Sequence, residues 1–235
     1  MSAPDFEANR EPALLLDSGS LSDVRAAVGD CLVDSLTTNP SLIARGLETG
    51  ADHDTPVLLK HARALIELVP GLVFVQPFSS DPDEALRQAR KLAEHEPKRV
   101  VVKLLARRCF LPVARSLHDE GIQTAMTAVF SPAQALVAHE AGYDWVIPYV
   151  DRAARHGSGA ATTVRALADA LGPLDNSPRI LAASIKSPAQ AIEALEQRSC
   201  AISAPLDVLR DMAEHPLSLA AQEQFDSDLE RFRSA

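Results

Sequence analysis

Short apolar runs alternate with longer amphipathic segments along the whole of this 235-residue chain. A run of four to eight apolar, β-branched residues predicts a buried strand, whereas apolar residues at helical spacing predict a helix. Eight strand-then-helix units in a chain of this length predict a single (β/α)₈ barrel of the α/β class. A flavodoxin-like open sheet is the weaker alternative, because it leaves strands unaccounted for. The candidate strands are residues 13–17, 33–38, 72–78, 100–105, 123–129, 145–150, 179–184 and 200–205.

The segments between these strands carry helix-start signals. Two of them begin with Ser-Pro-Ala-Gln, where Ser131 and Ser187 are predicted N-caps and Pro132 and Pro188 are the first helical residues. The helical patterns between strands include residues 83–95, 131–142 and 187–197. Loops rich in Gly, Pro, Asp or Asn are predicted at residues 46–54 and 172–178.

After the eighth strand come a helix at residues 206–214 and a second amphipathic stretch at residues 219–232. The barrel needs one helix there, so the second is predicted to pack across the barrel or against a neighbouring subunit. We therefore expect a homo-oligomer. Residues 13–235 are assigned to the barrel domain with its C-terminal helix, and residues 1–12 to a flexible N-terminal extension.

Composition excludes several classes of function. A net charge of −9 and an aromatic content of 4% argue against a nucleic-acid surface. The chain has neither a long apolar segment nor the basic, apolar start of a signal peptide, which predicts a cytosolic protein without a membrane partner. Three widely spaced cysteines suggest neither disulfides nor zinc, and Cys31, Cys109 and Cys200 are predicted to be reduced core residues.

A lysine interrupts the strand-like run VVVKLL at position 103. An ammonium ion in a buried strand loses hydration that it cannot easily recover. By itself, such a strand-end lysine is expected to extend its head to solvent. The functional alternative is a Schiff-base nucleophile, because desolvation inside a barrel lowers the pKa of Lys103 and frees the lone pair of its amine.

Other polar residues fall at the ends of the first seven strands, where barrel enzymes carry out their chemistry. Asp17 either caps a helix or transfers a proton, and Asn39 either caps the helix that Pro40 begins or holds a substrate hydroxyl. Gln76, Thr127 and Tyr149 are either buried polar groups whose hydrogen bonds are made within the protein, or together they bind one water molecule. The candidates are Asp17, Thr37, Thr38, Asn39, Gln76, Lys103, Thr127, Tyr149, Arg152 and Ser184.

Two late cations have a similar double interpretation. Arg152 and Lys186 are either ordinary surface residues or, at adjacent strand ends, a clamp for a phosphate. The histidines show no spacing typical of a catalytic or metal site. Those in helical segments are predicted to be solvated: His61, His95, His118 and His139. No metal motif is present, which disfavours metal-dependent aldol chemistry.

Five stretches follow one another from residue 13 onward: LLLDSGSLSDVRAAV, VDSLTTNPSLIA, VVVKLL, TAMTAVFSPAQALVAHEAGYDWVIPYVDR and ILAASIKSPAQAIEAL. In this order and spacing they resemble the small transaldolases and fructose-6-phosphate aldolases. The resemblance implies a (β/α)₈ class I aldolase without a cofactor, in which Lys103 forms an imine with a phosphorylated ketose and an aldehyde leaves. A transaldolase then passes the dihydroxyacetone unit to an aldose phosphate, whereas an aldolase hydrolyses it off.

The same resemblance implies roles for the other candidates. Asp17 acts as general acid and base, and the substrate hydroxyls are bound after the second strand. The remaining groups divide into a water site and a phosphate site. The assignments are Thr37, Thr38 and Asn39 for donor hydroxyls, Gln76, Thr127 and Tyr149 for the water, and Arg152, Ser184 and Lys186 for the phosphate.

Two positions bear on which reaction is run. Transaldolases commonly carry Glu where this chain has Gln76, and Phe where it has Tyr149, whereas the aldolase branch carries Gln and Tyr. A tyrosine hydroxyl can orient the water that hydrolyses an imine, which phenylalanine cannot do. The resemblance therefore favours an aldolase-type site.

The chain departs from the family at two places. The family's K-x-P-x-T is replaced by a run from Lys103 to Arg107 and Arg108 without the proline, and its Arg-Ile-Asp by Arg-Ala-Ala from Arg152 onward. The two arginines are either solvated surface residues or partners of an anion at a helix start, and we hypothesise that they adapt the enzyme to another sugar, such as a longer phosphorylated ketose. The altered segment after Lys103 also leaves open a non-catalytic barrel that binds a sugar phosphate.

Overall fold

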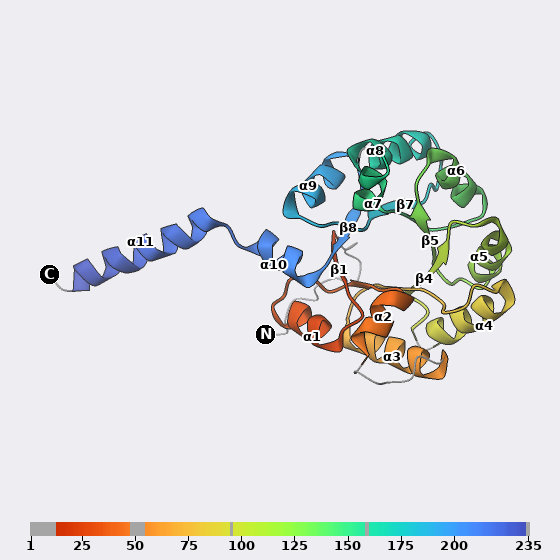
Figure 1. The fold of residues 1–235 in the computed structure, drawn as a ribbon, viewed down its shortest axis with the longest axis horizontal. Coiled ribbons are helices and arrows are strands. Elements are labelled where there is room, and N and C mark those ends of the chain that lie inside the picture. Colours follow the sequence, from red (N-terminus) through yellow and green to blue (C-terminus); the bar gives the residue numbers. More distant parts are fainter. Residues whose placement is uncertain (1–12, 48–54, 95, 158–159, 234–235) are drawn as a thin grey trace, which may run out of the picture.

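A closed barrel of eight parallel strands forms the centre of the molecule (Figure 1), in a computed structural model that describes residues 13–47, 55–94, 96–157 and 160–233. Each strand pairs with its neighbours in sequence, and β1 closes the barrel against β8. The predicted (β/α)₈ fold and all eight predicted strands are confirmed. The strands are β1 (Leu14–Asp17), β2 (Leu36–Thr37), β3 (Val73–Val75), β4 (Val100–Leu105), β5 (Thr124–Val129), β6 (Trp145–Pro148), β7 (Arg179–Ala182) and β8 (Ala201–Ala204).

Alternate residues of the strands fill the barrel interior, because successive side chains of a strand point to opposite faces. Leu15 and Val101 belong to this inner cluster, and the ring of Phe74 meets that of Trp145 edge to face at 5.2 Å between centroids. Two residues further along β1 and β4 stand Asp17 and Lys103, so the same inward alternation carries both side chains toward the barrel's carboxyl end.

Helices surround the barrel and bury a second, larger core against the outer face of the strands. Ser131 and Ser187 cap their helices through their side chains, and proline follows each of them, as predicted. The helices are α1 (Leu21–Gly29), α2 (Pro40–Gly46), α3 (Thr55–Leu68), α4 (Pro82–Ala93), η1 (Arg108–Phe110, a 3₁₀ turn), α5 (Leu111–Asp119), α6 (Pro132–Glu140), α7 (Val150–Arg155), α8 (Ala160–Leu171), α9 (Pro188–Glu196), α10 (Leu206–Ala213) and α11 (Pro216–Arg233).

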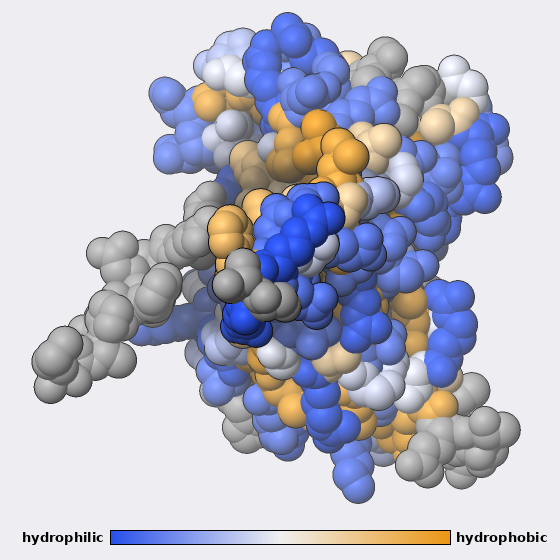
Figure 2. All heavy atoms as spheres, turned by 90° about the vertical axis from the view of Figure 1, so that its left-hand side faces the viewer, coloured by the Kyte–Doolittle hydropathy of each residue, from blue (hydrophilic) through white to orange (hydrophobic). Residues whose placement is uncertain are grey.

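The additional C-terminal helix, α11, projects away from the barrel as a separate arm (Figure 1). It buries no residue, and its large apolar side chains are exposed, with Phe225 at 62% and Phe232 at 81%. Figure 2 faces this side of the molecule and shows hydrophobic patches within a mostly hydrophilic surface. Of the two predicted packings of α11, the one across its own barrel is therefore wrong, and the one against a neighbouring subunit stays a prediction.

Some predictions fall outside the described residues. These are the flexible extension at residues 1–12, most of the loop at 46–54, and His95. The boundary between an extension and a barrel domain therefore stays a prediction. The other predicted loop, at residues 172–178, consists of turns and irregular chain between α8 and β7.

The predicted burial of the cysteines is wrong. Cys31, Cys109 and Cys200 are free but exposed, because they lie in connections or turns and not within strands or helices that face the core. The predicted exposure of His61 is also wrong. Its position on α3 faces inward, and its ring Nε2 lies 2.7 Å from the carbonyl oxygen of Gly19. This bond satisfies a buried carbonyl in the loop that follows β1.

Candidate active site

A cleft of about 770 Å³ opens at the carboxyl ends of the strands. Residues at or just beyond the ends of β1 to β8 line it, so the closed barrel brings together groups that are far apart in sequence. The predicted candidates in its lining are Asp17, Asn39, Gln76, Lys103, Tyr149, Arg152, Ser184 and Lys186. The other three, Thr37, Thr38 and Thr127, are buried and contact two of these residues.

Lys103 is the buried cation of the site. Only 2% of its surface is exposed, so the expectation that it extends to solvent is wrong. Its Nζ donates hydrogen bonds to Thr37 Oγ1 at 3.0 Å and to the carbonyl oxygen of Thr38 at 2.9 Å. Burial lowers the pKa of Lys103 to about 8, and the negative charge of Asp17 opposes this shift. A much larger share of the amine is therefore neutral near pH 7 than for an exposed lysine.

Asp17 ends β1 and faces the same cleft. Burial raises the pKa of its carboxyl group, and the positive charges of Lys103, Lys186 and Arg45 oppose the increase. A carboxyl whose pKa is raised holds a proton more readily, which suits a group that must both accept and return one. The Asp17 side chain forms no helix cap; Ser20 caps the following helix instead.

The turn after β2 supplies hydrogen-bonding groups. Asn39 caps α2, where its Oδ1 accepts a bond from the backbone nitrogen of Leu42 at 3.0 Å. Its amide nitrogen is a further donor at the cleft. The hydroxyl of Thr38 is buried and has no hydrogen-bond partner among the described residues. The capping and ligand-binding interpretations of Asn39 are therefore compatible.

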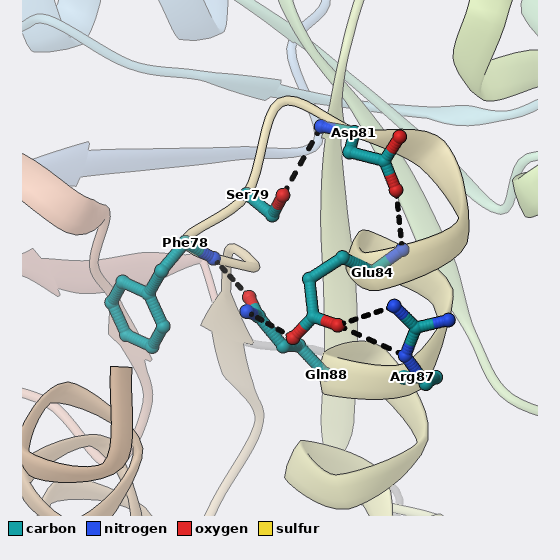
Figure 3. A network of polar contacts seen from close by, with 6 residues as sticks. All are labelled: Phe78, Ser79, Asp81, Glu84, Arg87 and Gln88. Carbon is teal, nitrogen blue, oxygen red and sulfur yellow. Dashed lines mark hydrogen bonds and ion pairs between the residues drawn. The ribbon is translucent and has the colours of Figure 1, made fainter. Parts of the chain in front are cut away.

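Three uncharged polar groups come from β3, β5 and β6. Thr127 Oγ1 donates a hydrogen bond to Tyr149 Oη at 3.2 Å, and burial raises the pKa of the Tyr149 hydroxyl, which keeps it protonated. Gln76 enters the cleft from the end of β3. The chain beyond it is anchored to α4, because the backbone nitrogen of Phe78 donates to Gln88 Oε1 at 2.7 Å (Figure 3).

Cations gather on the side of the cleft formed by β6 and β7. The Arg152 guanidinium lies 4.9 Å from the centroid of the Tyr149 ring, and Ser184 has a left-handed backbone with φ of 64°. Lys186 follows two residues later and is exposed. Together these three residues offer two positive charges and a hydroxyl, a set suited to a phosphate.

Several residues of the site were not predicted. Arg45 of α2, the loop residues Ser18 and Gly19, and Asp23 of the first turn of α1 also line the cleft, and Ser18 Oγ donates to Asp23 Oδ2 at 2.8 Å. Their spacing carries no recognisable motif. The sequence also did not predict that the backbone of Gly19 packs closely against α2. A Cβ at Gly19 would lie 2.2 Å from the Leu42 carbonyl oxygen.

The arginines of the altered segment do not line the cleft. Arg107 and Arg108 are exposed at the start of η1, beyond the end of β4. No group of three potential metal-binding side chains occurs in the part of the chain that the structure describes. Within the same residues, no helix is long and apolar enough to cross a membrane, and the cytosolic location stays a prediction.

A closed eight-stranded barrel with a polar cleft at the carboxyl ends of its strands has the arrangement of a (β/α)₈-barrel enzyme. Residues 14–234 match the model of the transaldolase/fructose-6-phosphate aldolase family. The chain belongs to this family and is an enzyme of the transaldolase family.

Among its curated relatives are three proteins named probable transaldolase. That of Syntrophobacter fumaroxidans is 30% identical over 92% of this chain and 96% of its own length. That of Chlorobium phaeobacteroides is 32% identical, over 91% and 94% respectively. That of Herpetosiphon aurantiacus is 30% identical, over 94% and 96%. The non-catalytic barrel is thus not supported.

Proposed function

We propose that this chain is a class I aldol enzyme that forms an imine with a ketose phosphate and cleaves off or transfers a dihydroxyacetone unit. The observation that carries the proposal is the buried amine of Lys103, which faces the cleft with a pKa of about 8. A neutral amine is the form that attacks a carbonyl, and a protonated imine then accepts the electrons of a breaking carbon–carbon bond.

The steps balance with groups of this chain. The Lys103 amine adds to the ketose carbonyl, and the resulting hydroxyl leaves as water with a proton from the protonated Asp17 carboxyl, which gives a protonated imine and the Asp17 carboxylate. This carboxylate then takes the proton from the hydroxyl on the carbon two bonds from the imine carbon, which becomes the aldehyde. The bond between that carbon and the carbon next to the imine breaks, its electrons form an enamine with the former imine, and the aldehyde departs. Return of a proton to the enamine and addition of water free the dihydroxyacetone unit.

The remaining polar residues of the cleft bind the substrate. Its phosphate is bound by Arg152, Ser184 and Lys186, and its hydroxyls are bound by Thr37, Thr38 and Asn39 at the end of β2. Gln76, Thr127 and Tyr149 hold the water that hydrolyses the imine. The hydrogen bond from Thr127 supports this role, since it fixes the Tyr149 hydroxyl beside the cleft.

Reductive trapping tests the imine. Borohydride treatment with fructose 6-phosphate is expected to increase the protein mass by the reduced ketose adduct in the native chain, and to leave Lys103→Ala unmodified. Lys98→Ala is the matched control, because Lys98 is an exposed lysine outside the cleft lining. No adduct with any ketose phosphate, or an adduct that persists in Lys103→Ala, would refute the mechanism.

A transaldolase reaction is the second candidate, favoured by the relatives, which are named probable transaldolase. It includes the variant in which the acceptor is a longer sugar that reaches Arg107 and Arg108. Measuring free dihydroxyacetone in the absence of an acceptor separates the two reactions. The aldolase releases it at each turnover, whereas a transaldolase retains the unit until an aldose phosphate arrives. Unchanged sugar preference in Arg107→Ala would exclude a role for that arginine.

We also propose that the chain forms a homo-oligomer through α11. Its exposed stripe includes Phe225, Leu229 and Phe232, which recur at helical spacing and bury nothing in the single chain. Light scattering is expected to give a multiple of the chain mass, and a Phe225→Asp, Phe232→Asp variant a smaller assembly. A native protein that stays monomeric at micromolar concentration would contradict this.

A further inference from the structure

A second concavity lies between α3 and α4, on the outside of the barrel, where these helices are neighbours (Figure 1). It has a volume of about 400 Å³ and shares no lining residue with the cleft. Leu59, Ile66 and Leu92 supply apolar surface within it. We refer to this concavity as the α3–α4 groove.

Three cations surround the α3–α4 groove: Lys60 and Arg63 from α3, and Lys91 from the last turn of α4. All three are exposed, and none has an ion-pair or hydrogen-bond partner among the residues that the structure describes. Glu94 is the single carboxylate of the lining, so the groove carries an excess of positive charge. Its charge is opposite to that of the chain as a whole, which is −9.

The unpaired state of these cations contrasts with neighbouring arginines. On α4 itself, Arg87 pairs with Glu84 at 2.6 Å and Arg90 pairs with Glu120 at 2.6 Å. Lys91 acts on Glu84 only through its charge and makes no ion pair or hydrogen bond with it among the described residues. Lys60 and Arg63 lie three residues apart on α3, and like charges that are neighbours on one helix repel each other. A bound anion would remove that repulsion.

We propose that the α3–α4 groove binds an organic anion in which a phosphate or carboxylate is joined to a short apolar group. The cations attract and hydrogen-bond the anionic group, while the leucine and isoleucine side chains cover the apolar part. A bare sugar phosphate suits the groove poorly, because its hydroxyls would face apolar surface. The site is independent of the aldol reaction, and the inference does not rest on the proposed function.

Lysine footprinting tests the site and distinguishes it from the cleft. The full chain is acylated briefly with an amine reagent, with or without phenyl phosphate, and each lysine is quantified by mass spectrometry. Lys60 and Lys91 are expected to lose at least about threefold in labelling rate at saturation, as charge-assisted hydrogen bonds form. Lys98, exposed outside the groove, is the internal control and is expected to stay unchanged.

Two comparisons test the chemistry of recognition. Inorganic phosphate is expected to require about tenfold higher concentration than phenyl phosphate for half-protection, because it lacks the buried ring. Arg63→Gln is expected to raise the half-protection concentration of phenyl phosphate about tenfold through loss of a charge-assisted bond. Arg87→Gln, which removes an exposed arginine of α4 outside the groove, is the matched control and is expected to leave it unchanged.

Three outcomes would overturn the proposal. The first is no protection of Lys60 and Lys91 at millimolar phenyl phosphate, or equal protection of Lys98. The second is equal potency of inorganic phosphate, which would mean that the apolar surface contributes nothing. The third is protection that appears without any probe at high protein concentration and is lost on dilution, since a second copy of the chain would then occupy the groove.

Discussion

The pH dependence of imine formation is expected to follow the perturbed titration of Lys103. Burial lowers the pKa of this amine from 10.5 to about 8. At pH 7 the neutral fraction is then about 9%, against about 0.03% for an unshifted lysine, an increase of about 300-fold. The rate of imine formation should therefore increase about tenfold from pH 7 to a plateau about two units higher, with its midpoint near the pKa of Lys103.

Cyanoborohydride trapping measures this profile. The chain is incubated with fructose 6-phosphate at constant ionic strength over a series of pH values, and the initial rate of adduct formation is followed by mass spectrometry. A midpoint near 10.5, the ordinary lysine value, would refute the argument that burial activates the amine. A rate independent of pH would do the same, because deprotonation of Lys103 would not then limit attack.

Asp17→Asn tests the coupling between the two groups. The carboxylate raises the pKa of Lys103, so its removal is expected to move the midpoint of trapping below about pH 8. Turnover should nevertheless fall by about 10²–10⁴, because the proton acceptor is lost. A midpoint that stays in place or moves upward would show that Asp17 does not act on the amine.

Three further substitutions probe other parts of the molecule. Tyr149→Phe is expected to lower release of free dihydroxyacetone about tenfold relative to transfer to an aldose phosphate, because the hydroxyl beside the water site is lost; equal losses in both assays would contradict that role. Arg152→Gln should raise the KM for a ketose phosphate about tenfold while addition of unphosphorylated dihydroxyacetone is unchanged, as steady-state kinetics would reveal. Gly19→Ala is expected to cost about 3 kcal/mol in urea unfolding, since its Cβ would lie 2.2 Å from the Leu42 carbonyl oxygen, whereas the open position Gly29→Ala should be near neutral.

The strands and helix starts were predictable because their signals are local. The run at residues 100–105 is β4 residue for residue, and Ser131 caps its helix by accepting a hydrogen bond from the backbone nitrogen of Gln134, with Pro132 as the first helical residue. Each pattern depends on neighbours within a few positions, where backbone geometry fixes which side chains share a face. Strand boundaries were less certain, since only Leu36 and Thr37 of the predicted residues 33–38 pair as β2.

The burial of individual side chains was harder to predict. Cys109 lies in a run that begins with buried residues, yet it is exposed on η1. His61 lies on an amphipathic helix, yet it contacts a carbonyl oxygen 42 positions earlier in the chain. These outcomes depend on residues far away in sequence, and periodicity carries no information about them.

The sequence by itself determined the barrel and placed a polar group at the end of each of the first seven strands. Both follow from short-range patterns, because the alternation of strand and helix segments can be recognised from residues close together in the chain. The tertiary structure decided what those groups can do. Closure of the barrel buries Lys103 against Thr37 and Thr38, places Asp17 near enough to act on its charge, and brings Arg45 to the same cleft. A pKa depends on burial and on charges in space, and these exist only once the eight strands have closed.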